Sequence, residues 1–142
     1  MGYNMQAKIY DYLPQEAIDI RTAVFINEQG FQDEFDDIDE KAIHIVLCED
    51  NKPIAVCRVY YSEDKKCYAI GRIAVMKEYR GKAYGAKVVQ VAEDEIQKRS
   101  GNKIGLSAQE RVRKFYEKLG YKKYGDIYFD EGCPHIWMEK TL

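Results

Sequence analysis

The sequence lacks the features that mark a membrane-spanning, secreted or nucleic-acid-binding protein. No apolar run among its 142 residues approaches the roughly 18 residues of a membrane-spanning helix, and its N-terminal residues do not follow a signal-peptide pattern. The 22 basic and 24 acidic residues give a formal net charge of −2, so no basic excess indicates a nucleic-acid partner. We therefore expect a cytoplasmic protein that binds neither a membrane nor nucleic acid.

Cysteine spacings typical of metal or redox sites are also missing. The four cysteines are far apart and form no CxxC pair, and a chain of this length can build a core without disulfides. We expect reduced thiols at Cys48, Cys57, Cys67 and Cys133. Internal repeats, low-complexity tracts and Gly/Ser-rich linkers are absent too, which predicts a single domain over residues 1–142.

What the sequence does contain is a regular succession of strand and helix patterns. Short apolar or alternating runs predict strands, and apolar residues at helical spacing predict helices. This order predicts an α/β fold of the α+β type, with a mostly antiparallel sheet, one parallel crossing and helices on both faces. The expected strands are 6–11, 42–49, 54–61, 67–75, 103–108, 121–129 and 135–140, and the expected helices are Pro14 to Gly30, 83–98 and roughly 110–119.

The most informative segment is a loop between a strand and a helix. The strand at 72–75 leads to Arg80-Gly81-Lys82-Ala83-Tyr84-Gly85, which opens the helix. A helix start offers unpaired N–H groups and partial positive charge, the glycines allow close approach, and the two cations add full charges. The pattern is compatible with phosphate binding and with a plain turn that carries surface cations, since a single glycine loop is a weak signal. It lacks the GK[ST] ending of a P-loop and the GxGxxG dinucleotide fingerprint.

Two segments resemble the motifs of the GNAT acetyltransferase superfamily. The loop 80–85 is similar to that family's Q/R-x-x-G-x-G/A loop, which grips the pyrophosphate of coenzyme A; Ala83 stands where glycine is usual. Residues 109–121 resemble its N-x-x-A-x-x-x-Y-x-K-x-G-F/Y segment, with Gln109 in place of asparagine and Val112 in place of alanine. The resemblance implies the GNAT fold, in which the sheet is split into a V between the strands at 67–75 and 103–108.

The rest of the chain resembles the ElaA-like branch of this superfamily. The resemblance implies an acetyl-CoA-dependent N-acetyltransferase that acts on an amine of a small molecule or peptide and uses no metal. It leaves open a homodimer, a longer acyl chain, and an acyl-CoA-binding sensor without efficient turnover. The residues that carry it are Arg21, Val24-Phe25, Glu28-Gln29, Glu34, Asp36, Asp39, His44, Leu106 to Gln109 and Glu131 to His135.

The resemblance also implies which residues bind the cofactor. The strand edge at Ile73, Ala74 and Val75 would pair with the pantetheine arm, and an N–H near Val75 would polarise the acetyl carbonyl; a buried strand is the plain alternative. The pyrophosphate would lie on the loop and the first helical turn, which comprise Arg80, Gly81, Lys82, Ala83, Tyr84, Gly85 and Ala86.

Tyr116 matches the tyrosine that the family uses as general acid toward the departing thiolate. The ordinary pKa of tyrosine, about 10, lies above that of a thiol, about 8.5, so the hydroxyl still holds a proton that it can donate when the thiolate departs. Without the surrounding motif, a single helical tyrosine would be read as a core residue.

The general base stays open among Glu28, Glu34, Glu131, His135 and a chain of water molecules. Imidazole ordinarily titrates near pH 6.5, which suits a base, but His44 and His135 both adjoin apolar strand residues and are equally compatible with a structural role. On the acceptor side, the resemblance suggests Glu28, Glu34 and His135 as substrate-binding residues. Cys133 as a nucleophile has no Cys–His–Asn pattern to support it.

An acidic run at 33–40, DEFDDIDE, holds six acids in eight positions, so we expect it outside the packed core. By resemblance it would lie over the acceptor side. There it would attract a cationic amine, or it would simply be a solvated loop. Arg21 would pair with one of these acids or hold an anionic group of the substrate.

Overall fold

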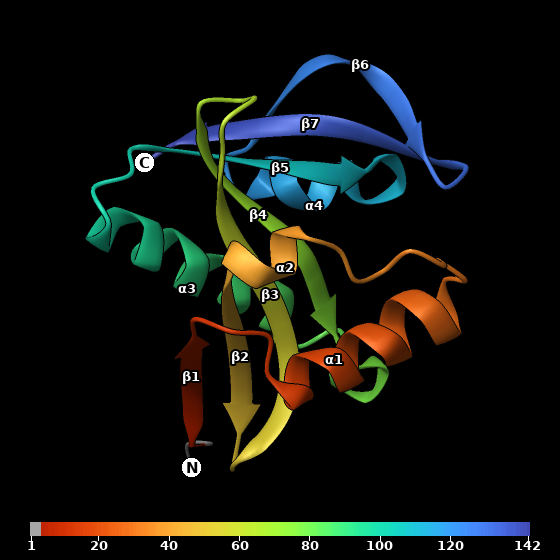
Figure 1. Cartoon of the computed structure of the whole chain (residues 1–142), viewed down its shortest axis with the longest axis vertical. Coiled ribbons are helices and arrows are strands. Elements are labelled where there is room, and N and C mark those ends of the chain that lie inside the picture. Colours follow the sequence, from red (N-terminus) through yellow and green to blue (C-terminus); the bar gives the residue numbers. More distant parts are fainter. Residues whose placement is uncertain (1–3) are drawn as a thin grey trace.

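A seven-stranded sheet forms the centre of the protein in the computed structural model, which describes residues 4–142 (Figure 1). The strands lie in the order β1-β2-β3-β4-β5-β7-β6, and neighbours are antiparallel except β4 and β5. The strands are β1 (Met5–Tyr10), β2 (Ile43–Glu49), β3 (Lys52–Ser62), β4 (Cys67–Val75), β5 (Lys103–Gln109), β6 (Lys122–Asp130) and β7 (Cys133–Thr141).

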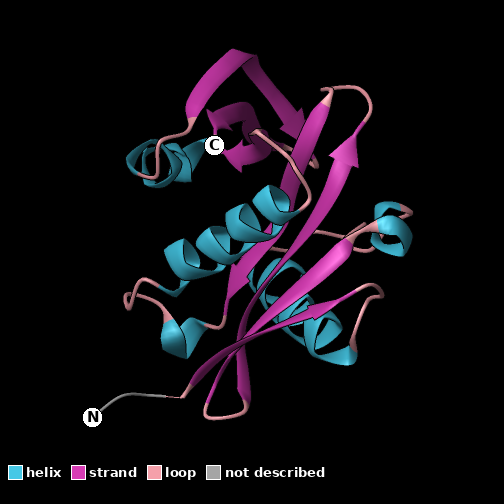
Figure 2. Cartoon of the chain, turned by 90° about the vertical axis from the view of Figure 1, so that its left-hand side faces the viewer, coloured by secondary structure: helices cyan, strands magenta, loops and turns pink. Residues whose placement is uncertain are grey.

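Helices cover both faces of the sheet (Figure 2). The order of elements confirms the predicted α+β fold class. The sequence patterns did not predict two features: the first helix continues as a π-helix, and a short helix lies inside the acidic run. The helical elements are α1 (Gln15–Arg21), the π-helix η1 (Thr22–Glu28), α2 (Ile38–Lys41), the 3-10 turn η2 (Lys77–Tyr79), α3 (Tyr84–Lys98), the 3-10 turn η3 (Glu110–Val112) and α4 (Arg113–Lys118).

The central strands are apolar on both faces because each face is covered. Along β2, Ile45 and Leu47 pack toward α3, whereas Val46 and Cys48 pack toward α1. This explains why residues 45–48 form a continuous apolar run rather than an alternating one. The α3 side of the core is the larger of the two, and α4 adds Tyr116 to it.

The sheet divides between β4 and β5. The two strands pair in parallel only at Tyr68↔Ile104, Ala69↔Gly105 and Ile70↔Leu106. Beyond Ile70, β4 stays with β3 while β5 stays with β7, so the strands diverge (Figure 1). This is the V that the family resemblance implies, and it opens toward the end of β4.

A β-bulge lies at the start of this divergence. Val56 pairs with Ala74 and Arg58 pairs with Gly71, so Arg72 and Ile73 of β4 lie opposite the single residue Cys57. Arg72 has a φ of 53°, in the left-handed region that a non-glycine residue seldom adopts. The bulge changes the direction of β4 where it leaves β5.

The structure bears on two expectations from the sequence, the reduced cysteines and the absence of a membrane-spanning helix. The four cysteines are free thiols, of which Cys48, Cys57 and Cys67 are buried and Cys133 is half-buried. Within residues 4–142, no helix is long and apolar enough to cross a membrane. Residues 1–3, which belong to the N-terminus where no signal-peptide pattern was expected, lie outside the described residues.

Candidate active site

The open edge of β4 is the first part of the candidate site. Ile73, Ala74 and Val75 lie beyond the last β4–β5 pair, so no described strand pairing joins their backbone to β5. Their side chains still pack, since Ala74 contacts the α1 cluster while Ile73 and Val75 contact the α3 cluster. A pairing edge for a ligand and a packed strand therefore coexist here, because the backbone hydrogen-bonding direction is perpendicular to the side chains.

The glycine loop joins this edge to the start of α3. A Cβ built on Gly85 would lie 3.3 Å from Cζ of Phe115 and 3.8 Å from Cγ2 of Val75, so the end of β4, the start of α3 and α4 meet at Gly85. The N-cap residue Ala83 makes no side-chain cap in this 15-residue helix, so the N–H groups of Gly85 and Ala86 in the first turn are positioned to bind an anion. Ala83 has a φ of 66°, a left-handed conformation that costs a non-glycine residue about 1–2 kcal/mol, and the family's preference for glycine there has this physical reason.

The two cations of the loop have different surroundings. The Arg80 guanidinium donates to both carboxylate oxygens of Glu28, at 2.9 and 2.7 Å, and to the carbonyl of Val75 at 2.9 Å. Arg80 thus braces the loop against η1 and β4 instead of extending freely toward a phosphate. Among the described residues no carboxylate pairs with Lys82, whose ammonium lies 5.7 Å from the Tyr79 ring centre, so Lys82 is the cation left for a ligand.

Tyr116 lies in α4 with 8% of its surface exposed. Its ring makes edge contacts with Phe115 and Tyr121, at centroid distances of 5.0 and 6.2 Å. Burial, and to a smaller extent the nearby Cys57 thiol, raises the pKa of the Tyr116 hydroxyl above its ordinary value. The side chain is therefore both a core residue and a group that keeps its proton throughout the physiological pH range.

The acidic run meets the sequence-based expectation at four of its acids, which are exposed, but not at the other two; the exposed acids are Asp33, Asp36, Asp37 and Glu40. Glu34 and Asp39 are 4% and 5% exposed, and they lie inside the protein rather than outside its core. They are held in a set of ion pairs, called below the arginine–carboxylate network, which consists of Arg21, Arg58, Arg72, Glu34, Asp36 and Asp39. All of its members except Arg72 and Asp36 are buried.

Arginines from three elements neutralise the network carboxylates. Arg21 of α1 contacts Glu34 at 2.8 Å and Asp39 at 2.7 Å. Arg58 of β3 contacts Asp39 at 2.9 Å and Asp36 at 2.6 Å. Arg72 of β4 completes the set with Glu34 at 2.9 Å and Asp36 at 3.3 Å. Because each carboxylate pairs with two arginines, these acids do not form a free negative field for a cationic substrate.

The network also explains the state of Asp39 and His44. Burial by itself would raise the pKa of Asp39, but hydrogen bonds from Arg21 and Arg58 outweigh it and lower the pKa to about 2. His44 Nε2 lies 2.9 Å from the Asp39 carbonyl oxygen, and burial lowers the pKa of its imidazole. A carbonyl only accepts, so Nε2 carries the proton and His44 has the structural role that the sequence left open.

The carboxylates considered as general base are all engaged. Glu28 is bound by Arg80, whose hydrogen bond lowers the pKa of Glu28. Glu34 belongs to the arginine–carboxylate network. Glu131, in the turn between β6 and β7, accepts the backbone N–H groups of Gln32 at 2.9 Å and Asp33 at 3.1 Å. The hydrogen bond from Arg80 makes Glu28 a weaker base. Burial raises the pKa of Glu34 although its arginine partners oppose the change, but those partners occupy its carboxylate. The Glu131 oxygens are likewise occupied by backbone N–H groups.

His135 differs from the carboxylates because one of its ring nitrogens is left over. Its Nδ1 lies 2.8 Å from the Cys133 carbonyl oxygen, and a carbonyl only accepts, so in the neutral ring Nδ1 carries the proton. Nε2 then keeps its lone pair, and no hydrogen-bond partner for it occurs within the described part of the chain. The ring is 8% exposed and stacks on Tyr128, whose hydroxyl hydrogen-bonds to Ser107 of β5.

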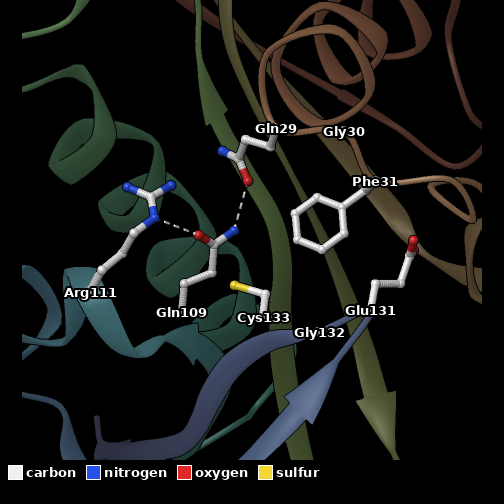
Figure 3. A pocket seen from close by; sticks show the side chains of 8 residues that line it. All are labelled: Gln29, Gly30, Phe31, Gln109, Arg111, Glu131, Gly132 and Cys133. Atoms are coloured by element: carbon white, nitrogen blue, oxygen red, sulfur yellow. Dashed lines mark hydrogen bonds between the residues drawn. The ribbon is translucent and has the colours of Figure 1, made fainter.

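A pocket of about 310 Å³ lies between the end of η1, the end of β5 and the β6–β7 turn (Figure 3). The Gln109 side chain forms part of the pocket wall, where it donates a hydrogen bond to Gln29 at 2.9 Å and accepts one from Arg111 at 3.0 Å. Phe31 supplies an apolar surface and Cys133 lines the floor (Figure 3). Gln109 pairs with His135 in the β5–β7 register, so the pocket adjoins the histidine.

Sequence reasoning missed Arg58 and Arg72, which hold the acidic run. Both occur within otherwise apolar strand runs, VCRVY and IGRIAV. An arginine in such a run is almost never buried without an acidic partner. The signal was therefore present, although it could not identify which acids each arginine contacts.

Comparisons with known proteins agree with this architecture. Residues 10–142 match the family model described as an acetyltransferase (GNAT) domain. The UPF0039 protein C11D3.02c of Schizosaccharomyces pombe is 34% identical over 126 residues, covering 87% of this chain and 84% of that protein. Protein ElaA of Escherichia coli is 28% identical over 130 residues, covering 88% and 85% of the two chains.

Solved structures with the same fold cover nearly all of this chain. A protein from Lactobacillus plantarum superposes with a TM-score of 0.88 and 27% identity, over 97% of this chain and 98% of that one. E. coli ElaA has a TM-score of 0.83, over 98% and 99% of the chains. An aminoglycoside 6'-N-acetyltransferase complexed with coenzyme A has a TM-score of 0.76 at 18% identity, over 96% of each chain.

Proposed function

The chain belongs to the GNAT acetyltransferase family, and from this premise we propose that it transfers the acetyl group of acetyl-CoA directly to an amine of a small molecule or peptide. The observation that carries the proposal is the continuity of three features: the open edge of β4, the uncapped start of α3 that follows it, and Tyr116 in α4. Gly85 lies where these three elements meet. Such an arrangement suits an extended donor with a phosphate group at one end.

The donor side divides into an edge and an anion site. The backbone of Ile73 to Val75 would pair with the pantetheine arm, and an N–H near Val75 would stabilise the charge that develops on the acetyl oxygen. The N–H groups from Gly81 to Ala86 would hold the pyrophosphate, with Lys82 as the nearby cation. Bound acetyl-CoA supplies an acetyl group already activated as a thioester.

The proton transfers fall to two residues on opposite sides of the sheet. His135 Nε2, with its free lone pair, would accept a proton from the amine as nitrogen bonds to the acetyl carbon. Tyr116 would give its proton to the sulfur as the carbon–sulfur bond breaks. Glu28 and Glu34, which the resemblance suggested on the acceptor side, are bound to arginines and would shape the site instead.

The proposal is tested by measuring acetyl-CoA binding and amine-dependent thiol release. Acetyl-CoA at one hundred times its dissociation constant should stabilise the protein by about 2.7 kcal/mol. An amine library, read out by free thiol, should identify acceptors. A raised Tm without thiol release for any amine would favour the sensor alternative, and an unchanged Tm in millimolar acetyl-CoA would contradict both readings.

The Gly85→Glu variant should lose the acetyl-CoA-induced shift in Tm, because it brings a carboxylate to the helix start that would receive phosphate. Gly85→Ala is the matched control, since it adds only the Cβ that meets Phe115 at 3.3 Å. We expect Gly85→Ala to retain the shift. Equal shifts in the wild type and Gly85→Glu, with similar Tm values without ligand, would place the phosphate elsewhere.

The His135→Asn variant should lower kcat/KM by about 10²–10⁴-fold, the usual cost of losing a general base. Asparagine can still donate to the Cys133 carbonyl but lacks the Nε2 lone pair, so the local fold should survive. The acid limb of the pH–rate profile should also disappear. His44→Gln is the matched control: it should lower Tm while the remaining activity keeps the acid limb. If the His135→Asn variant kept the wild-type pH–rate profile, water rather than His135 would be the general base.

A further inference from the structure

Arg72 connects two parts of the molecule that the proposed reaction must align. Its backbone forms the bulge that directs β4 into the open edge at Ile73 to Val75. Its side chain leaves the strand and donates to the carbonyl oxygen of Glu34 from Nε and Nη2, at 3.2 and 3.0 Å, while Nε also lies 2.9 Å from the Glu34 carboxylate. Nη2 further contacts Asp36 at 3.3 Å. The left-handed backbone at Arg72 is thus held from outside the sheet.

The bulge is supported from the neighbouring strand as well. Arg58 of β3 pairs with Gly71, and a Cβ at Gly71 would lie 3.5 Å from Arg58 Nε. Arg58 itself reaches Asp36 and Asp39. Two arginines, one inside the bulge and one beside it, therefore extend from the sheet to the same short acidic segment.

That acidic segment continues directly into the wall of the pocket. Phe31 lines the pocket, the N–H groups of Gln32 and Asp33 bind the Glu131 carboxylate, and Glu34 follows immediately. The loop is thus fixed at one end to the β6–β7 turn and at the other end to Arg72 and Arg21. A movement of this loop would therefore displace the pocket wall together with Glu34 and Asp36, the two acids that Arg72 contacts.

We propose that Arg72 is a positioning residue. It fixes the position of the pocket wall at 29–34 relative to the open edge of β4, so that the acceptor amine meets the thioester. This inference rests on the proposed function and adds to it how the two half-sites are aligned. A misplacement of about 1 Å between reacting groups can cost on the order of 10²-fold in rate. Arg72 acts through the backbone that it holds and does not touch the reacting atoms.

The Arg72→Gly variant separates positioning from general stabilisation. Glycine adopts the left-handed backbone without strain, so the bulge keeps its conformational preference while the link to Glu34 and Asp36 is lost. We expect kcat to fall by about 10²-fold, with the acetyl-CoA dissociation constant within about threefold of wild type. Arg99→Ala, which removes an exposed arginine paired with Glu95 on α3, is the control and should change neither value.

Amide hydrogen exchange gives a readout that does not depend on activity. In Arg72→Gly, the amides of 73–75 and of 31–34 should exchange about tenfold faster together, whereas those of β2 should be unchanged. Faster exchange confined to the loop would overturn the coupling, even if wild-type protein acetylated no amine and the proposed function itself failed.

Kinetic results decide the remaining cases. A kcat within about threefold of wild type overturns the inference, and so does a loss of acetyl-CoA affinity by the same factor as kcat, because Arg72 would then act on donor binding alone. Arg72→Lys keeps the charge without the planar fork that spans Glu34 and Asp36, so it should show an intermediate loss of kcat. If Arg72→Gly does not fold, the same kinetic criteria apply to Arg72→Lys.

Discussion

The Tyr116→Phe variant should lower kcat by about 10²–10⁴-fold, or roughly 3–5 kcal/mol of barrier. The substitution keeps the buried ring and its contacts with Phe115 and Tyr121, so folding and acetyl-CoA binding should survive. The loss should fall on kcat rather than KM, because the proton is needed only as the thiolate departs.

Tyr121→Phe is the matched control for this prediction. Tyr121 is also a buried tyrosine, but its hydroxyl donates to Glu93 at 2.7 Å, away from the open edge of β4. Removing that hydroxyl should lower stability and leave kcat within about threefold. A Tyr116→Phe enzyme with wild-type kcat would show that the thiolate takes its proton from water, and Tyr116 would then be a core residue only.

The pH dependence of Tyr116 follows from its burial. A general acid must be protonated, and burial raises the pKa of this hydroxyl, so its protonated form persists well above the ordinary tyrosine pKa of about 10. Wild-type activity should therefore show no alkaline limb from Tyr116 up to about pH 10. A limb below that value that disappears in Tyr116→Phe would contradict the buried, protonated state.

The Arg21→Ala variant should destabilise the protein by about 3–5 kcal/mol, the usual cost of removing one partner from a buried ion pair. Arg21 is 1% exposed, and its loss leaves Glu34 and Asp39 with fewer partners in the interior. Urea unfolding at neutral pH measures the effect. Arg99→Ala, which removes an exposed arginine from its i,i+4 pair with Glu95, should cost at most about 1 kcal/mol. Similar losses for the two variants would mean that the buried network adds little stability.

Acid should weaken the same network. The pKa of Asp39 is lowered to about 2 in the folded protein, below its ordinary value of 3.8. The stability that this shift contributes is present above the unfolded pKa and is lost as pH falls through the folded one, hence between about pH 5 and pH 2. Wild-type stability should fall across that window, and Arg21→Ala should lose less there because Asp39 then has only Arg58.

Local patterns in the sequence determined the order and type of the elements. The succession from β1 to β7 follows from apolar spacing, and Gly120, with a φ of 98°, follows the end of α4 in the left-handed conformation that glycine favours. The glycine loop at 80–85 was recognisable for the same reason, because its residues are adjacent in the chain and lie on a strand–loop–helix connection. Motifs of this kind depend on neighbours a few residues away, which the sequence displays directly.

Only the tertiary structure decided which charges are paired and which proton carriers are available. Arg21, Arg58 and Arg72 meet their acids across 13 to 38 residues of chain, so the acidic run did not indicate that Glu34 and Asp39 are buried. The Cys133 carbonyl, whose direction the fold sets, binds Nδ1 of His135 and so leaves Nε2 as the nitrogen with the lone pair. Charges are buried only where long-range packing provides compensation, and that compensation is a property of the folded arrangement, which no local pattern contains.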